Sequence, residues 1–307
     1  MSADPRAGGV LVIGEALVDV VDGTPHPGGS PLNVAVGLAR LGHAASFVGR
    51  FGRDEFGDLI ARHLRDNGVR SLLPADAQPT SVALATLAPD GSATYQFELV
   101  WELPGLPQVL PAALRDARLL HTGSIATVLH PGAASALAAV ERARAEGVRV
   151  SFDPNCRPSI TPDAERARAA VEAFVALSDL VKASDEDLRW LYPDRSVEES
   201  AQEWRRLGPG LVVVTRGSQG AFAASAAGLI AVPARPVAVA DTVGAGDSFM
   251  AALIDGVLEL GERGLGELTA SEVEGLLARA GAAASLTVGR PGADPPTRPE
   301  LDAALSR

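Results

Sequence analysis

Short apolar runs alternate with amphipathic segments along the first quarter of the chain. Residues 10–13 form an apolar run that predicts a buried strand, and residues 45–48 predict the next one. Between them, apolar residues recur at helical spacing from 33 to 41 and stop before Gly42, a residue typical of helix ends. Residues 58–66 show a second amphipathic helical pattern. The order strand, helix, strand, helix predicts a parallel sheet covered by helices.

The middle segment has a different period. Residues 81–87 are apolar and rich in strand formers, and Pro89-Asp90-Gly91 is a turn signal. Residues 93–100 then alternate between apolar and polar side chains, which places Tyr95 and Phe97 on one face. We therefore expect an antiparallel hairpin inserted into the α/β pattern. Its apolar face needs a partner, which is a substrate cleft, a second subunit or both.

The alternation of strands and helices then resumes. Strands are expected at residues 118–121, 148–152, 180–181 and 211–215, and helices at 133–146, 164–177, 197–207, 248–260 and 271–286. No internal repeat or low-complexity linker interrupts the pattern. It predicts a single doubly wound α/β domain over residues 1–307 that carries a small β lid.

Composition narrows the setting of the protein. Of the 307 residues 47% are hydrophobic, yet no apolar run reaches the roughly 20 residues of a membrane helix. Residues 1–9 lack the pattern of a signal peptide. Cys156 is the only cysteine, so no intrachain disulfide can form, which is typical of a reducing compartment. We therefore expect a soluble cytoplasmic protein with no membrane partner.

Charge and lysine content exclude several classes of protein. The net charge of −11 disfavours nucleic acid as a partner, because its affinity depends on basic contacts to phosphate. Lys182 is the only lysine, and the P-loop pattern G-x-x-x-x-G-K-[ST] is absent. The V-A-I-K strand of protein kinases is absent as well. An anionic cosubstrate can still bind where the potential is locally positive.

The strongest chemical signal is the segment 241–249 (DTVGAGDSF). A β-like stretch at 236–240 leads into it, and a helix follows. Two glycines at a helix start let the amides face outward, where they and the helix dipole form an anion site. Asp247 would lie in the first turn as a carboxylate. A base beside amides that hold a phosphoryl group is what phosphorylation of a hydroxyl requires. An ordinary cap followed by an acidic first turn is the alternative interpretation.

Three motifs together resemble the ribokinase-type (PfkB-type) carbohydrate kinases. Residues 241–253 are similar to the C-terminal signature of that family, and residues 28–35 (GGSPLNVA) and 49–57 (GRFGRDEFG) are similar to its N-terminal signature. The resemblance implies a ribokinase-like three-layer α/β/α sandwich, with a lid formed by about residues 15–27 and 80–103. The opening GEALVD and the GGSPLN variant are most similar to fructokinases.

The resemblance assigns the reacting groups. The catalytic base is Asp247, and the anion hole is formed by the turn residues Gly244, Ala245 and Gly246.

On the sugar side, the resemblance makes Asp19 and Asn33 ligands of hydroxyl groups. Gly29 would allow a close approach of the sugar, because it has no Cβ. Structural roles stay open: Asp19 is also interpretable as a turn or cap residue, and Asn33 as the N-cap of a helix over 34–41.

Residues 153–158 (DPNCRP) follow a strand, so they lie where open α/β sheets bind ligands. Arg157 would contact a sugar or a phosphate with its fork of donors, although a surface arginine explains it as well. Similar D-P-N-x-R segments in fructokinases and 2-keto-3-deoxygluconate kinases favour the binding role. Phe97, together with Tyr95 and Gln96, would help to select the sugar. Cys156 is interpreted as a packing residue.

The segment 182–187 (KASDED) occupies the place where the family often has Asn-x-x-Glu near Mg²⁺ and the phosphates. Ser184 and Asp187 stand in those two places, so the resemblance puts Ser184 near the phosphates and makes Asp187 the candidate acid for Mg²⁺. Lys182 would also lie near phosphate. An acidic helix N-terminus is the alternative interpretation of the same residues.

The remaining nucleotide contacts come from two further segments. The resemblance places Thr215, Gly217 and Gly220 along the nucleotide, together with Gly246 of the glycine turn. Asp241 and residues 282–292 would form a monovalent-cation site.

These assignments predict a sugar kinase that uses ATP and Mg²⁺, with stimulation by K⁺, and phosphorylates a hydroxyl of a small sugar. Fructose is the first candidate, with 2-keto-3-deoxygluconate and ribose as alternatives. A nucleoside kinase and a catalytically silent sugar-binding protein are further alternatives. The resemblance and the cost of exposing a strand edge predict a homodimer.

Overall fold

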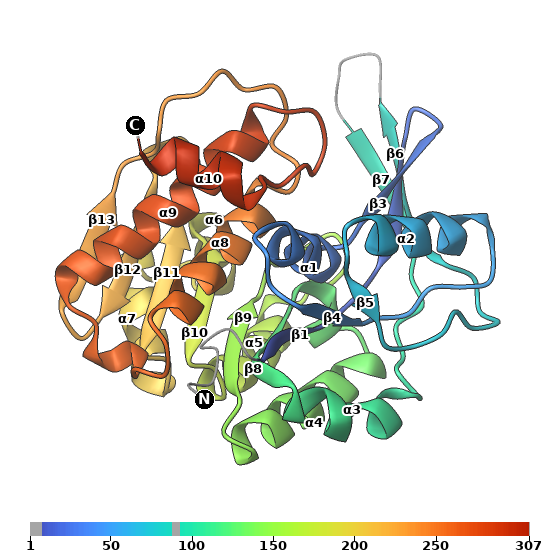
Figure 1. Cartoon of the computed structure of the whole chain (residues 1–307), viewed down its shortest axis with the longest axis horizontal. Coiled ribbons are helices and arrows are strands. Elements are labelled where there is room, and N and C mark those ends of the chain that lie inside the picture. Colours follow the sequence, from blue (N-terminus) through green and yellow to red (C-terminus); the bar gives the residue numbers. More distant parts are fainter. Residues whose placement is uncertain (1–7, 88–92, 307) are drawn as a thin grey trace, which may run out of the picture.

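Nine strands form one central sheet in residues 8–87 and 93–306, the parts of the chain that the computed structural model describes. They are β1 (Gly9–Ile13), β4 (Ala45–Val48), β5 (Arg70–Ser71), β8 (Ala117–Gly123), β9 (Arg149–Asp153), β10 (Leu180–Ser184), β11 (Leu211–Thr215), β12 (Ala221–Ser225) and β13 (Gly228–Val232). Their order is β13-β12-β11-β10-β9-β8-β1-β4-β5 (Figure 1). The pairs from β5 to β11 are parallel, so their carboxyl ends share one edge of the sheet.

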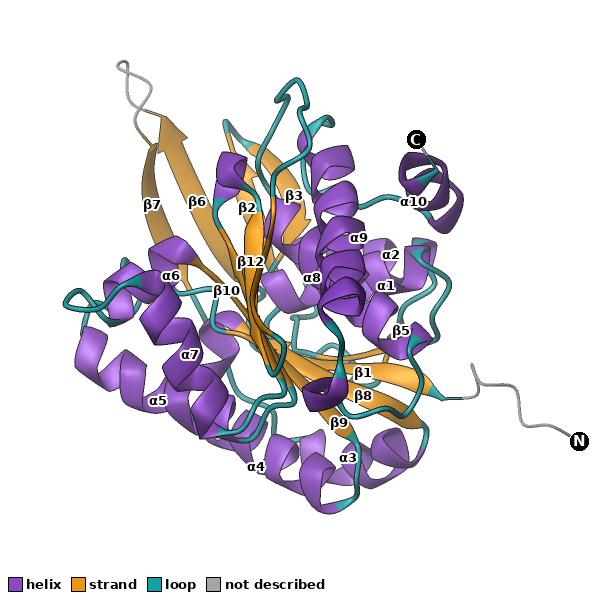
Figure 2. Cartoon of the chain, turned by 90° about the vertical axis from the view of Figure 1, so that its left-hand side faces the viewer, coloured by secondary structure: helices purple, strands orange, loops and turns teal. Residues whose placement is uncertain are grey.

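Helices cover both faces of this sheet (Figure 2). One face carries α1 (Ser30–Arg40), α2 (Glu55–Asp66), α8 (Ala245–Glu259) and α9 (Ala270–Val288), and the other carries α3 (Leu106–Arg115), α4 (Gly132–Ala145), α5 (Ala164–Ala176), α6 (Asp185–Leu191) and α7 (Val197–Leu207). Because side chains alternate along a strand, Val10 and Val12 join one core while Leu11 and Ile13 join the other. The three-layer α/β/α sandwich is therefore confirmed. None of the helices in the described ranges has the length and hydrophobicity of a membrane span.

A second, four-stranded sheet lies beside α2 (Figure 1). It consists of β2 (Leu17–Val21), β3 (Thr24–Gly28), β6 (Ser81–Leu87) and β7 (Ala93–Glu98), in the order β3-β2-β6-β7. Strands β6 and β7 pair antiparallel, as the alternation of residues 93–100 predicted. The turn signal Pro89-Asp90-Gly91 between them lies outside the described residues. The small sheet draws on the two segments from which we expect the lid.

Several boundaries differ from the sequence-based expectation. Helix α1 begins at Ser30 rather than 33, since Pro31 in its first turn favours an early start. Helix α8 begins at Ala245 rather than 248, so part of the glycine turn is itself helical. The β-like stretch expected at 236–240 is not a strand but an irregular segment. The hairpin of β12 and β13 was missed, because β12 reads AFAAS and alanine is a poor strand former.

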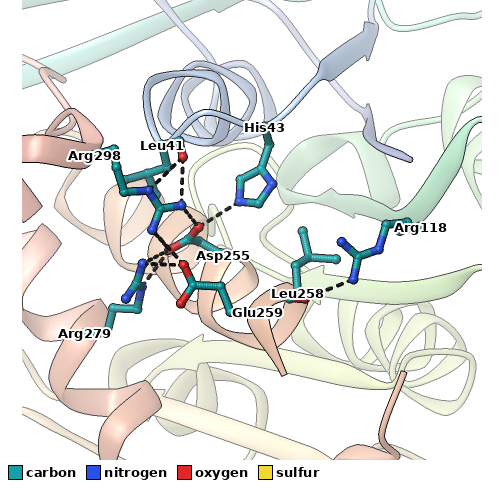
Figure 3. A network of polar contacts seen from close by, with 8 residues as sticks. All are labelled: Leu41, His43, Arg118, Asp255, Leu258, Glu259, Arg279 and Arg298. Atoms are coloured by element: carbon teal, nitrogen blue, oxygen red, sulfur yellow. Dashed lines mark hydrogen bonds and ion pairs between the residues drawn. The ribbon is translucent and has the colours of Figure 1, made fainter. Parts of the chain in front are cut away.

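A buried carboxylate anchors the far half of α8 (Figure 3). Asp255 is 0% exposed and contacts His43 at 2.7 Å and Arg279 at 2.6 Å. It also pairs with Arg298 of α10 (Arg298–Leu305), which donates to the carbonyl of Leu41 at the end of α1. Burial alone would raise the pKa of Asp255, but these partners hold it below its usual value. The cluster ties α8 to α1, α9 and α10.

Candidate active site

The glycine turn forms the start of α8, beside the carboxyl end of β10. Gly244 is the N-cap and has a φ of 72°, a left-handed conformation that disfavours any residue with a Cβ. A Cβ at this position would also lie only 2.6 Å from the Cβ of Ala293. Gly246 and Asp247 follow in the first turn, whose amides have no acceptor within the helix and carry the positive end of its dipole. The turn is therefore able to hold an anion.

Asp247 faces the first turn of α1. Ser30 Oγ donates to Asp247 Oδ1 at 2.7 Å, and Asn33 Nδ2 donates to Oδ2 at 2.8 Å. The carboxylate is only half-buried, so the neighbouring helix orients it without enclosing it. Each carboxylate oxygen has capacity for another hydrogen bond. A carboxylate held in this way can accept a proton from a hydroxyl group that comes within hydrogen-bond distance.

The interpretation of Asn33 as an N-cap is wrong. Helix α1 begins three residues earlier, and Gly29 is its N-cap. Asn33 lies within the helix and uses its amide on Asp247 instead.

A cavity of about 590 Å³ opens beside the glycine turn. Thr215, Gly217, Gly220 and Gly246, all predicted on the nucleotide side, line it. The end of β13 and the irregular segment 233–239 form another part of its wall. Apolar side chains complete it, among them Phe249, Leu277 and Val288. The volume and the apolar wall suit the planar nucleobase of a nucleotide, with the phosphates of that nucleotide reaching the glycine turn. The stretch that was expected to be a strand is thus part of this wall.

Lys182 lies behind the turn and is almost completely buried. Its ammonium donates to Asp153 Oδ2 at 2.8 Å, and a Cβ on Gly246 would lie 3.2 Å from Lys182 Nζ. Burial alone would lower the pKa of Lys182, but the charges of Asp153, Asp187 and Asp247 raise it above its usual value. Burial raises the pKa of Asp153 to about 6, against the opposing charge of Lys182. The structure therefore brings a cation next to the anion site.

Ser184 and Asp187 form a capping box at the start of α6. The amide and the hydroxyl of Ser184 both donate to Asp187 Oδ2 at 2.7 Å, and the amide of Cys156 donates to Asp187 Oδ1 at 2.8 Å. This is the geometry of the alternative interpretation, an acidic helix N-terminus. Ser184 is not among the residues that line the described cavity. Burial raises the pKa of Cys156 far above its usual range, in agreement with a packing role.

Asp19 and Arg157 lie on the side of the small sheet. Burial raises the pKa of Asp19, the charges of Arg157 and His26 oppose this shift, and the charge of Asp247 reinforces it. Asp19 itself lies next to the start of α1, because a Cβ on Gly28 would be 2.2 Å from Asp19 Oδ2. Arg157 is exposed and donates to the side chain of Asn155 at 2.7 Å. Asp19 and Asn33 therefore both lie at the start of α1, where Asn33 contacts the candidate base Asp247.

The backbone around Gly29 requires glycine for steric reasons. Its φ is 106°, and a Cβ would lie 2.6 Å from the carbonyl oxygen of Glu15. Close contact with the backbone therefore requires glycine here, whether or not a sugar approaches. Phe97 lies in β7, opposite Ala83, and is half-buried.

Asp241 connects two loops next to the turn. Its Oδ1 accepts from the amide of Val243 at 3.0 Å, and its Oδ2 accepts from the amide of Gly292 at 2.9 Å. The hydrogen bond from Val243 is the main cause that lowers the pKa of Asp241, and the bond from Gly292 adds to it. The loops that we predicted to form a monovalent-cation site are thus joined by this charged carboxylate.

Sequence reasoning missed three polar residues of this region. Ser30 and Asp153 lie inside the motifs, but their partners Asp247 and Lys182 are 217 and 29 positions away, and no local pattern reveals such pairs. Glu15 is 4% exposed and accepts a hydrogen bond from the amide of Ala126. Burial raises the pKa of Glu15 to about 7. Its only sequence signal was its place in the GEALVD opening.

The site fits a hydrated Mg²⁺ carried by a nucleotide. Across residues 8–87 and 93–306, no three His, Cys, Asp or Glu side chains gather as a metal site. Mg²⁺ binds phosphates and keeps several waters, so it needs few protein ligands. Of the predicted acids, Asp247 keeps hydrogen-bonding capacity for such water ligands, whereas both oxygens of the buried Asp187 already accept hydrogen bonds from Ser184 and from the amide of Cys156.

Comparison with known proteins gives consistent results. The chain matches the model of the pfkB family carbohydrate kinases over residues 10–300. A fructokinase of Klebsiella pneumoniae is 37% identical over 260 residues, which cover 81% of this chain and 84% of that protein. A fructokinase of Xylella fastidiosa, solved with bound ATP, superposes with a TM-score of 0.87 at 27% identity and covers 97% of this chain and 98% of that one. A fructokinase double mutant of Vibrio cholerae O395, solved with fructose, ADP and potassium ion, gives 0.80 at 29% identity, with 98% of each chain covered. The likeness therefore extends over nearly the whole chain.

Proposed function

The chain belongs to the pfkB family of carbohydrate kinases, and from that premise we propose that it transfers the γ-phosphoryl group of ATP to a hydroxyl of fructose. One observation carries the proposal. Asp247, oriented by Ser30 and Asn33, stands in a glycine turn that also borders the 590 Å³ cavity. A base and an anion site thus meet where a nucleotide and an alcohol can approach each other.

The geometry supports an in-line transfer. The hydroxyl oxygen of the sugar forms a bond to the γ-phosphorus, while the bond from that phosphorus to the bridging oxygen breaks and ADP leaves. Asp247 accepts the hydroxyl proton. The amides of Gly246 and Asp247, the dipole of α8 and the ammonium of Lys182 stabilise the charge on the phosphoryl oxygens. Mg²⁺, when bound with the nucleotide, neutralises further phosphate charge.

Fructose is proposed because relatives over most of the chain are fructokinases, one of them solved with fructose. The small sheet would close over the sugar and exclude water, with Asp19, Asn33, Phe97 and Arg157 as the contacts. Closure of this kind limits wasteful hydrolysis of ATP.

We also propose a K⁺ site at Asp241, whose carboxylate joins two loops beside the turn and remains ionised. A relative with fructose and ADP was solved with potassium ion. Activity measured in K⁺ should exceed activity in an otherwise identical buffer containing only tetramethylammonium, and equal rates would contradict the site.

A homodimer in the cytoplasm completes the proposal. Strand β3 is a free edge of the small sheet in the described residues, and a second copy would cover it. Light scattering tests the dimer, and a monomer at working concentrations would refute it.

The decisive experiment is ADP release with a panel of acceptors. The panel contains fructose, 2-keto-3-deoxygluconate, ribose, adenosine and inosine, each with ATP and Mg²⁺. The highest kcat/KM should be found with fructose. A higher kcat/KM with the keto acid, ribose or a nucleoside would refute fructose as the substrate and identify the preferred acceptor instead. Binding of fructose without ADP release would indicate a catalytically silent protein.

A further inference from the structure

A buried ion pair lies directly behind the anion site. Lys182 of β10 and Asp153 of β9 have side-chain exposures of 5% and 0%, and 2.8 Å separates Nζ from Oδ2. The ammonium lies so close to the turn that a Cβ on Gly246 would be 3.2 Å from it. No other lysine occurs in the sequence. The pair therefore places a unique ammonium at the base of the helix that carries Asp247.

A second hydrogen bond holds the carboxylate of Asp153 in place. Its Oδ1 accepts from the amide of Asn155 at 3.1 Å, while its Oδ2 accepts from Lys182. The turn that contains Asn155 is itself held to α6, because the amide of Cys156 donates to Asp187. Both carboxylate oxygens of Asp153 thus face donors from fixed parts of the backbone or from Lys182.

We propose that Asp153 is a positioning residue that holds the ammonium of Lys182 against Gly246, so that its charge faces the transferring phosphoryl group. The inference rests on the proposed kinase function and adds a residue that acts only through Lys182. A cation fixed before the reaction stabilises the developing negative charge without rearrangement, which is the source of its effect.

The surroundings of Lys182 show why Asp153 matters most. Asp153 on β9, Asp187 on α6 and Asp247 on α8 all act on its charge, and Asp153 makes the direct hydrogen bond. His121 on β8 contributes no positive charge at neutral pH, because burial lowers its pKa to about 3. Without Asp153, burial would favour the neutral amine.

The variant Asp153→Asn tests the proposal at nearly constant volume. An amide cannot accept from both Lys182 and the amide of Asn155, since one of its two ends is a donor. We expect kcat/KM for ATP to fall about 10- to 100-fold per folded molecule, the range for loss of one charge-stabilising group. The alkaline limb of the pH profile of kcat/KM should also move to lower pH, because Lys182 loses its proton more easily without the charge of Asp153.

Asp255→Asn is the matched control. It removes the charge of another buried, ion-paired aspartate, but one that touches neither the turn nor the cavity. We expect it to lower Tm while KM for ATP, kcat and the alkaline limb stay at their wild-type values. If the alkaline limb moved to lower pH by a similar amount in both variants, a general loosening of the structure, and not Lys182, would be the cause.

A double-mutant cycle with Lys182→Met isolates the pathway. If Asp153 acts through Lys182, Asp153→Asn should cause little further loss in the Lys182→Met background. If Asp153→Asn alone fails to fold, the double variant can be measured in its place, because a buried ion pair with both charges removed is often as stable as the charged pair. It should still show the loss in kcat/KM for ATP. Wild-type kinetics in Asp153→Asn or in the double variant would overturn the proposal. It would also be overturned if the losses in kcat/KM caused by the two single substitutions were fully additive in the double variant.

Calorimetry keeps this inference separate from the proposed function. We expect Asp153→Asn to weaken binding of a non-hydrolysable ATP analogue with Mg²⁺ by about tenfold or more, as for a lost charged hydrogen bond. If the wild-type protein phosphorylated no sugar but this difference appeared, the kinase function would fail while the role of Asp153 stood. Equal affinities of the wild type and the variant would refute that role.

Discussion

Replacement of the candidate base by its amide, Asp247→Asn, is the sharpest perturbation of the site. The carboxylate accepts from Ser30 at 2.7 Å and from Asn33 at 2.8 Å. An asparagine can keep both contacts, because its oxygen accepts from Asn33 while its NH₂ group donates to the Ser30 hydroxyl, which accepts as well as donates. We therefore expect the fold, the stability and the binding of ATP to change little.

Asp247→Asn should lower kcat. An amide cannot accept the hydroxyl proton, and general bases contribute a factor of about 100 to 10,000 to the rate. The barrier should then rise by about 3 to 5 kcal/mol, at about 1.4 kcal/mol for each tenfold change. Because substrate binding keeps its contacts, KM for ATP should stay within about threefold, and the loss should appear in kcat.

The assay is coupled ADP release with fructose and saturating ATP, accompanied by circular dichroism and calorimetric titration of the ATP analogue. A matched control is Asp255→Asn, which alters a buried aspartate on the same helix. Near-normal kcat in Asp247→Asn would refute the assignment of the base. A large fall in both variants would show that the integrity of α8, and not proton transfer, limits the reaction.

Three further predictions follow from single contacts. Ser30→Ala removes one donor that orients Asp247, and kcat measured by ADP release should fall about tenfold, whereas an unchanged kcat would mean that Asn33 alone suffices. Gly244→Ala places a Cβ at a residue with φ 72°, 2.6 Å from the Cβ of Ala293. Urea titration should therefore show a free energy of unfolding lower by about 2 kcal/mol or more, and ATP should bind more weakly. An unfolding midpoint equal to that of the wild type would contradict the strain expected at this turn. The lowered pKa of Asp255 means that its stabilisation is present above the unfolded pKa of about 4 and is lost as pH falls through the folded value. Urea titrations from pH 7 to 3 should therefore show a steeper decline for wild type than for Asp255→Asn, and parallel declines would refute the ion-pair account.

The sequence predicted the glycine turn and its aspartate at a helix start, but not the residues that contact them. The glycines and Asp247 are contiguous, so their spacing alone predicts an anion site next to a carboxylate at a helix start. Ser30 lies inside a motif that was recognised, yet its contact with Asp247 spans 217 positions. Asp153 likewise lies in a recognised segment, and its buried pairing with Lys182 depends on the registration of two neighbouring strands. Such contacts have no local pattern because they form between elements distant along the chain.

Amino-acid order by itself determined the layers of this protein and predicted its candidate reacting groups. Apolar runs of β1, β8 and β11 and the amphipathic helices between them fix the α/β class, since period and turn chemistry are local properties. The tertiary structure alone decided that residues 233–239 form a cavity wall, that Asp187 serves a capping box, and that α1 supplies the two donors to Asp247. These features depend on which surfaces meet when both cores pack, and packing is decided by the whole chain at once.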